Sequence, residues 1–355
     1  MSQKTLLIRH FMLTVILVFS TVSNVCAQEI RIGSYEFSDG AIYQGELFRG
    51  KPHGKGVTTF TNGDRHEGMY FKGKRQGEGT YLFSDGEKYV GDWFQDQQHG
   101  YGVYYFMNNN RYEGMWFRDY QQGEGTMYYY NGDVYVGNWE KDLREGDGVY
   151  TYSNGASYKG TWKNDMRDGQ GVFDWADGNR YEGTWKENQK SGQGTFVYST
   201  GDKYIGEWLS DEPHGRGIYS FNDGNRYEGS YVKGQRTGEG IFTFQNGDRY
   251  VGNFLDGDQS GMGTFTWSGG AVYVGSWKQN CQHGKGKYTS ASGDVYDGDW
   301  VEGVMEGEGI LRQSDGTKYK GQFKAGFKDG HGIQEDKNGV RYEGEFKAGE
   351  MVSQK

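Results

Sequence analysis

Cysteine is nearly absent from this chain: its 355 residues include two, Cys26 and Cys281. Two cysteines cannot build a disulfide framework, and Cys26 lies in a segment that we expect to be removed. Cys281 then remains alone, at what reads as a variable loop position. The stability of the fold must therefore come from its secondary structure and packing.

Apolar content is also low. Hydrophobic residues make up 34% of the chain, aromatic residues 17%, and there are 62 glycines. Because few aliphatic side chains are available, a core would have to consist largely of Tyr, Phe and Trp. Such a glycine-rich, polar composition is typical of disordered chains, unless the aromatic residues follow a strict pattern.

Basic residues are outnumbered, with 39 Lys and Arg against 48 Asp and Glu. An acidic balance disfavours nucleic acid and anionic membrane surfaces as partners, because both attract basic faces. No asparagine starts an Asn-x-Ser/Thr acceptor for N-glycosylation. This absence favours a bacterial envelope over a eukaryotic secretory route.

The N-terminus has the three parts of a secretory signal peptide. Residues 1–10 are polar and basic, residues 11–22 are a short apolar run, and small residues precede a cleavage site between Ala27 and Gln28. The apolar run is shorter than the roughly 20 residues that a membrane span needs. Lipidation of Cys26 is the competing interpretation. Cleavage would leave 37 Lys and Arg against 48 Asp and Glu, a net charge of −11.

What the chain does contain is a repeat of 23 residues. Fourteen times, at a constant spacing of 23 residues, an aromatic residue or histidine stands two residues before a glycine. We count this residue as position zero of each repeat. The series is Tyr43, His66, Tyr89, Tyr112, Tyr135, Tyr158, Tyr181, Tyr204, Tyr227, Tyr250, Tyr273, Tyr296, Tyr319 and Tyr342. A fixed period of this size indicates a repeat architecture that replaces the usual division into globular domains.

Each repeat contains two runs with the alternation of a half-buried strand. In the repeat of Tyr158, one run has Tyr, Gly and Trp at positions zero, two and four. The other run, Gly169–Trp175, has Gly, Gly, Phe and Trp at positions eleven, thirteen, fifteen and seventeen. Since strand side chains alternate between faces, aromatic residues and glycines share one face. Residues 163–168 read as a polar loop between the strands.

A second turn signal closes each repeat. Position twenty is glycine in every complete repeat except one, where it is Asn109, and Asn or Asp usually precedes it. Such pairs favour tight hairpin turns, which need positive φ angles. We therefore predict an all-β fold: a long antiparallel sheet of β-hairpins rolled into a trough. With two strands per repeat, it would be about 130 Å long.

The unit Tyr-x-Gly-x-Trp followed by Gly-x-Gly resembles the MORN repeat (membrane occupation and recognition nexus). Residues 135–148 show it most closely. The resemblance implies a stand-alone binding and scaffolding array, without the catalytic domains to which such arrays are sometimes fused. The predicted organisation is a signal peptide at 1–27, a capping strand within 28–42 and the array at 43–355.

No arrangement of residues indicates catalysis, a metal or a cofactor. His53, His99, His214 and His283 all precede the first Gly of Gly-x-Gly, but they lie in different repeats, too far apart to bind one ion. They read as loop histidines.

The candidate site is instead the aromatic stripe, which is either core or the lining of an open groove. Its richest stretch is Tyr112, Trp116, Tyr135, Trp139, Tyr158, Trp162, Tyr181, Trp185, Tyr204 and Trp208. We therefore expect an exported, non-enzymatic scaffold in the periplasm or at the cell surface, which binds a protein partner or copies of itself. The alternative is a module that binds phospholipid headgroups or envelope glycans.

Overall fold

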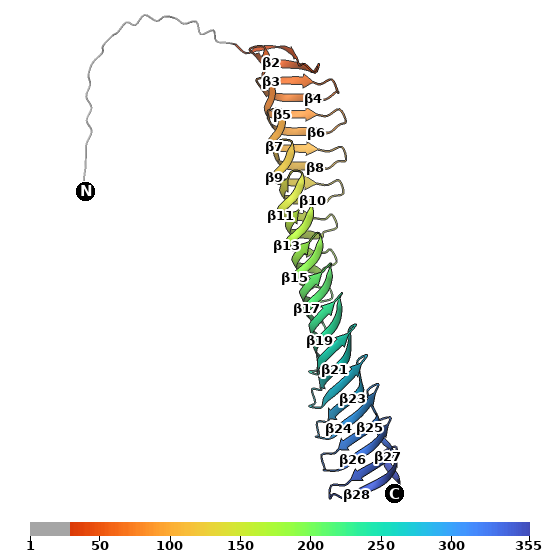
Figure 1. Ribbon diagram of the computed structural model, residues 1–355. Helices are drawn as coiled ribbons and strands as arrows, with labels where there is room; N and C mark the ends of the chain where they lie inside the picture. Colours follow the sequence, from red (N-terminus) through yellow and green to blue (C-terminus); the bar gives the residue numbers. More distant parts are fainter. Residues whose placement is uncertain (1–28) are drawn as a thin grey trace, which may run out of the picture.

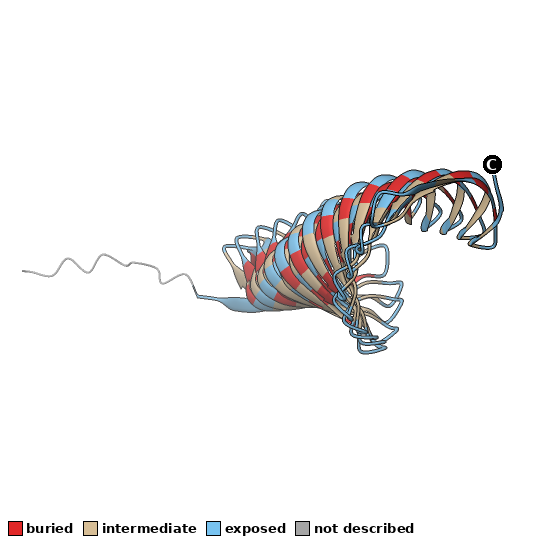
Figure 2. Cartoon of the chain, turned by 90° about the horizontal axis from the view of Figure 1, so that it is seen from below, coloured by how far each residue is buried: buried red, intermediate tan, exposed pale blue. Residues whose placement is uncertain are grey.

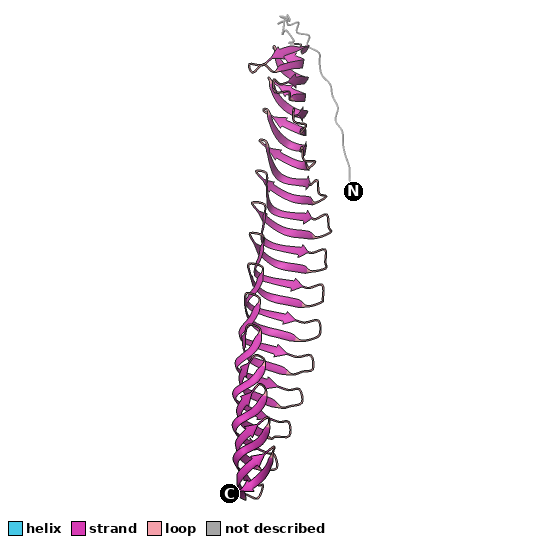
Figure 3. Cartoon of the chain, turned by 90° about the vertical axis from the view of Figure 1, so that its right-hand side faces the viewer, coloured by secondary structure: helices cyan, strands magenta, loops and turns pink. Residues whose placement is uncertain are grey.

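A computed structural model describes residues 29–355, and the predicted signal peptide lies outside these residues. The described chain is one elongated, twisted sheet of 29 strands, in which every strand pairs antiparallel with the strands before and after it (Figure 1). No helix in residues 29–355 could span a bilayer. The strands follow one another along the rod in chain order (Figure 1). Figure 3 shows them stacked side by side along its length. The predicted all-β array of antiparallel hairpins is confirmed.

Two kinds of strand alternate. The first strands of the repeats have seven residues each: β2 (Ile42–Phe48), β4 (Arg65–Phe71), β6 (Lys88–Phe94), β8 (Arg111–Phe117), β10 (Val134–Glu140), β12 (Ser157–Lys163), β14 (Arg180–Lys186), β16 (Lys203–Leu209), β18 (Arg226–Val232), β20 (Arg249–Leu255), β22 (Val272–Lys278), β24 (Val295–Val301), β26 (Lys318–Lys324) and β28 (Arg341–Lys347).

The second strands have nine residues each: β3 (Lys51–Thr59), β5 (Lys74–Leu82), β7 (Gln97–Tyr105), β9 (Tyr120–Tyr128), β11 (Leu143–Thr151), β13 (Met166–Asp174), β15 (Gln189–Val197), β17 (Glu212–Ser220), β19 (Gln235–Thr243), β21 (Asp258–Thr266), β23 (Cys281–Thr289), β25 (Val304–Arg312) and β27 (Phe327–Glu335). The sheet begins with β1 (Arg31–Glu36) and ends with β29 (Glu350–Gln354), which are shorter.

The loop expected at residues 163–168 is much shorter in the structure. Strand β12 ends at Lys163 and β13 begins at Met166, so two residues form the turn. Asn164 and Asp165 have φ angles of 47° and 65°, the positive values that a two-residue hairpin turn needs. Cys281 is likewise not in a loop: it is the exposed first residue of β23.

The turn at the other end of the hairpin has the positive φ that the sequence predicts at position twenty, but it is longer than a tight turn, since residues 152–156 separate β11 from β12. Gly155 has a φ of 91° and donates its backbone N–H to the carbonyl of Tyr152 at 2.9 Å. Asn109, the exception to glycine at this position, has a φ of 65°. Asparagine is among the non-glycine residues that adopt this conformation most readily.

A row of glycines crosses the sheet from strand to strand. Gly148 pairs with Gly160, Gly160 with Gly171, and Gly171 with Gly183. Beyond this row, the register of β12 against β13 shifts between Gly160 and Trp162, as at a β-bulge. Seen along the array, the strands bend into an arch, and buried positions form bands along the sheet (Figure 2).

Candidate functional site

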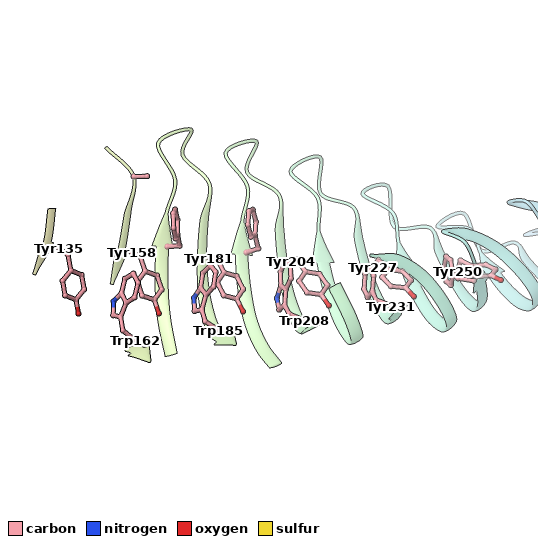
Figure 4. Close-up of a cluster of buried hydrophobic side chains, with 14 of the residues drawn as sticks. Tyr135, Tyr158, Trp162, Tyr181, Trp185, Tyr204, Trp208, Tyr227, Tyr231 and Tyr250 are labelled. Atoms are coloured by element: carbon pink, nitrogen blue, oxygen red, sulfur yellow. The ribbon is translucent and has the colours of Figure 1, made fainter. Parts of the chain in front are cut away.

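Tyrosine and tryptophan rings stack along the aromatic face in an edge-to-face ladder (Figure 4). The ring of Tyr158 lies 5.2 Å from that of Trp162 at 89° and 5.6 Å from that of Trp185 at 86°. The Tyr158 hydroxyl donates to the carbonyl of Thr161 at 3.0 Å. Tyr158 thus contacts the tryptophan of its own repeat and that of the next, and such contacts join neighbouring repeats. Edge-to-face pairs contribute about 0.5–1.5 kcal/mol each beyond burial.

The ten residues of the predicted stripe all lie in this ladder, and all are buried. The tyrosines are fully buried, and the tryptophans are 3–6% exposed: Tyr112, Trp116, Tyr135, Trp139, Tyr158, Trp162, Tyr181, Trp185, Tyr204 and Trp208. Burial raises the pKa of the Tyr158 hydroxyl. Of the two interpretations left open by the sequence, core or open groove, the burial favours core. A ligand cannot reach these rings without displacing others.

A second row of aromatic residues, at positions fifteen and seventeen, runs beside the ladder, and its members at position seventeen are more accessible. Phe173 and Trp175 of β13 lie 4.4 Å apart between ring centroids, and Trp175 lies 5.4 Å from Phe196 of the next repeat. The ring of Trp175 is half-buried. The signal for this row was present in the sequence, as aromatic residues at positions fifteen and seventeen, but the predicted site did not include it.

Cations cover the tryptophans from the second strands, and the sequence analysis missed them. The charged groups of Arg144, Arg167 and Lys190 lie 4.3, 4.3 and 4.4 Å from ring centroids. The rings are those of Trp162, Trp185 and Trp208, respectively. All three cations stand at position nine of their repeats. Partial burial lowers the pKa values of Arg167 and Lys190. Such pairs are worth about 0.5–2 kcal/mol each.

Both faces of the sheet carry grooves. On the aromatic face, a groove of about 390 Å³ is lined by residues that include Trp175, Arg167 and Lys190. On the opposite face, a groove of about 830 Å³ is lined by apolar side chains that include Ile205 and Val251, together with several glutamates. These are the accessible surfaces that a ligand or partner could occupy.

The four histidines that precede Gly-x-Gly are not in loops. They lie in the second strands β3, β7, β17 and β23, at His53, His99, His214 and His283. The ring of His53 packs between those of Phe48 and Phe71, at 5.4 and 5.3 Å between centroids. Within residues 29–355, no three His, Cys, Asp or Glu side chains are placed to hold a metal ion.

His66 takes the place of tyrosine in the ladder and should make the N-terminal repeats sensitive to acid. It is fully buried, and its Nδ1 lies 2.7 Å from the Tyr70 hydroxyl. Burial, and secondarily the charge of Arg75, lowers its pKa from 6.5 to about 3. The folded chain thus keeps His66 neutral, while the unfolded chain binds a proton below pH 6.5. Stability should fall by about 1.4 kcal/mol per pH unit as the pH drops from 6.5 towards 3.

His66→Tyr should remove this part of the acid sensitivity. We expect the difference in stability between the variant and the natural chain to grow as the pH falls from 7 to 4. Hydrogen exchange of β4 and β5 at several pH values would measure it. A constant difference across that range would show that His66 is protonated in the folded state.

Comparison with protein families finds one repeat type along nearly the whole described chain. The model of the MORN repeat matches fourteen consecutive segments: residues 43–65, 66–88, 89–111, 112–134, 135–157, 158–180, 181–203, 204–226, 227–249, 250–272, 273–295, 296–318, 319–341 and 342–354. A search of curated proteins finds no match.

Solved structures with some likeness include the TCP domain of SAS-4 (dCPAP) from Drosophila melanogaster, solved with a proline-rich motif of Ana2 (dSTIL). It is 16% identical, with a TM-score of 0.29, over 44% of this chain and 85% of that one. Virginiamycin B lyase from Staphylococcus aureus is 11% identical, with a TM-score of 0.13, over 87% of this chain and 92% of that one. At these TM-scores, neither likeness carries an argument about this chain.

Proposed function

The chain belongs to the MORN-repeat family, and from this premise we propose that it is a non-enzymatic scaffold of the bacterial cell envelope. It would hold a protein partner, or further copies of itself, along the rod. The observation that carries this proposal is the single uninterrupted sheet. Because one aromatic ladder joins all the repeats, the rod presents its surface groups at fixed spacing.

The face opposite the aromatic ladder is the surface best suited to a protein partner. Val136, Ile205 and Val274 are 51%, 42% and 47% exposed there. Ile205 pairs across strands with Ile218, and both line the 830 Å³ groove. Exposed apolar side chains in a groove are typical of interaction sites.

The partner test compares two matched substitutions on that face. The natural chain, Ile205→Lys and Val90→Lys would each be immobilised as residues 28–355 and incubated with envelope extract of the source organism. Val90 is 39% exposed and lies outside the groove, so it serves as the control. The proposal expects a protein that Ile205→Lys loses and Val90→Lys retains, or self-association in light scattering with the same dependence. If no partner or self-association depends on Ile205, this groove is not the docking surface.

The alternative function is binding of phospholipid headgroups. A net charge of −11 after cleavage opposes binding to anionic membranes, and any such binding should weaken with salt. Co-sedimentation with phosphatidylglycerol vesicles at low and high salt separates the two functions. The scaffold proposal expects little binding at either salt concentration. Strong, saturable binding would favour the lipid function instead.

Export to the periplasm or cell surface is part of the proposal and rests on the N-terminal sequence. Mass spectrometry of the protein purified from its source should show Gln28 as the first residue, because small residues precede the Ala27–Gln28 bond. A retained N-terminus, or a lipid on Cys26, would contradict this prediction.

A further inference from the structure

Two of the six cations at position nine, Arg75 and Arg144, are neutralised by the repeat that follows. Nε of Arg144 lies 2.9 Å from a carboxylate oxygen of Asp165, and Nε of Arg75 lies 3.5 Å from one of Asp96. In both pairs, the acid is the second residue of the next two-residue turn and also accepts the backbone N–H of the arginine's own residue. The ion pair is therefore built into the hairpin geometry.

The other four cations at position nine make no ion pair within residues 29–355: Arg167, Lys190, Arg236 and Lys328. The first two lie in consecutive repeats. The turn residue that faces Arg167 is Asn188, whose amide oxygen accepts the backbone N–H of Arg167 at 2.8 Å but carries no charge. Asp211 accepts the backbone N–H of Lys190 at 2.8 Å. The Lys190 ammonium itself, however, has no carboxylate within 4.0 Å among residues 29–355 and lies over aromatic rings, the nearest that of Trp208. Two half-buried cations thus share one nearby carboxylate.

Both cations line the 390 Å³ groove on the aromatic face. Its other lining includes the half-buried ring of Trp175 and three polar side chains, Asn154, Asn188 and Asp211. One oxygen of each polar side chain accepts a backbone N–H. The second polar atom of each has no hydrogen-bond partner in the described chain.

The groove therefore combines three kinds of group. It has a net positive charge, a flat aromatic wall, and amide and carboxylate groups that can pair with hydroxyls. A simple carboxylate would interact only with the positive charge. An apolar peptide side chain would cover the polar atoms without bonding to them, which costs binding free energy. A sugar ring that carries a carboxylate can use all three kinds of group. Its C–H groups pack on the aromatic ring of the protein, its hydroxyls bond to the polar side chains, and its carboxylate pairs with the cations.

We propose that this groove binds an acidic sugar residue of the uronic acid class, with its carboxylate between Arg167 and Lys190. This site is independent of the scaffold function, because it lies on the other face of the sheet from the proposed protein-binding groove. Binding should be weakened by salt, because it rests on charge.

The test is calorimetric titration of residues 28–355 with oligogalacturonate and with its neutral methyl ester. We expect the acid to bind at least about tenfold more tightly than the ester, since about 1.4 kcal/mol corresponds to a factor of ten. Asn188→Asp should weaken binding of the acid about tenfold or more, because it restores the pairing seen between Arg144 and Asp165. The fold should tolerate this change, since other repeats carry Asp at that position.

Asn179→Asp is the matched control. It adds the same charge nearby, outside the groove, at a position where other repeats carry Asp133 and Asp202, and it should leave binding unchanged. Equal binding of acid and ester would overturn the proposal. So would an Asn188→Asp variant that melts and binds like the natural chain. Tighter binding of a polyglutamate peptide than of oligogalacturonate would identify an acidic protein segment as the ligand instead. None of these outcomes bears on the partner test at Ile205.

Discussion

Gly160→Ala is expected to unfold the repeats around β12 and β13. A Cβ atom at Gly160 would lie 2.5 Å from the carbonyl oxygen of Gln170 and 2.5 Å from the Cα of Gly171, both backbone atoms of the paired strand. Since neither atom can move without breaking the strand pairing, the substitution should lower the free energy of unfolding by about 3 kcal/mol or more. Urea melts would measure the total loss, and hydrogen exchange would locate it.

Gly269→Ala is the matched control. A Cβ atom there would meet no atom within 4 Å, and the residue has no positive φ, so the variant should melt like the natural chain. Gly171→Val should also be strongly destabilising, because its Cβ would lie 2.3 Å from the hydroxyl of Tyr158, whose ring is fully buried and cannot move aside. If Gly160→Ala melts like Gly269→Ala, the glycine row does not set the close approach of the strands.

Much of this fold follows from the sequence because the repeat is local. Tyr158 and Phe173 face each other across a hairpin, fifteen residues apart, so alternation and turn chemistry together fix their pairing. The turn at Asn109 could be predicted for the same reason, because asparagine there adopts the positive φ that glycine has in the other repeats. Fourteen copies make each such inference independent of any single substitution.

The bend of the strands and the cation sites depend on contacts between repeats, and these were harder to predict. Position nine holds Arg167 in one repeat but Gln98 or Pro213 in others, so no periodic signal marks it. Its counter-charge lies 21 residues later, in a turn that sequence analysis read as a variable loop. Asn188 differs from an aspartate only by an amide nitrogen in place of a carboxylate oxygen. The structure is needed to show that this change leaves the charge of Arg167 without a partner.

Replacing Trp139 and Trp162 with alanine together is expected to unfold the middle of the rod rather than to remove a binding surface. The two rings are 4% and 5% exposed and pack on either side of Tyr135, at 5.2 and 5.4 Å between centroids. Each truncation of a buried tryptophan costs about 3–5 kcal/mol. Because both remove contacts of the same tyrosine, the two costs should not simply add.

The measurement is hydrogen exchange along the array, with circular dichroism as a function of temperature. Stability in a repeat array is a sum of local terms, so the loss of protection relative to the natural chain should be largest in β9 to β13 and smallest at the two ends. Tyr130→Ala is the control, since Tyr130 is 75% exposed and its truncation should leave exchange unchanged. A double variant that stays folded and loses a ligand would mean that these rings line an open groove. A double variant that unfolds locally assigns them to the core and leaves binding to the half-buried second row and the opposite face.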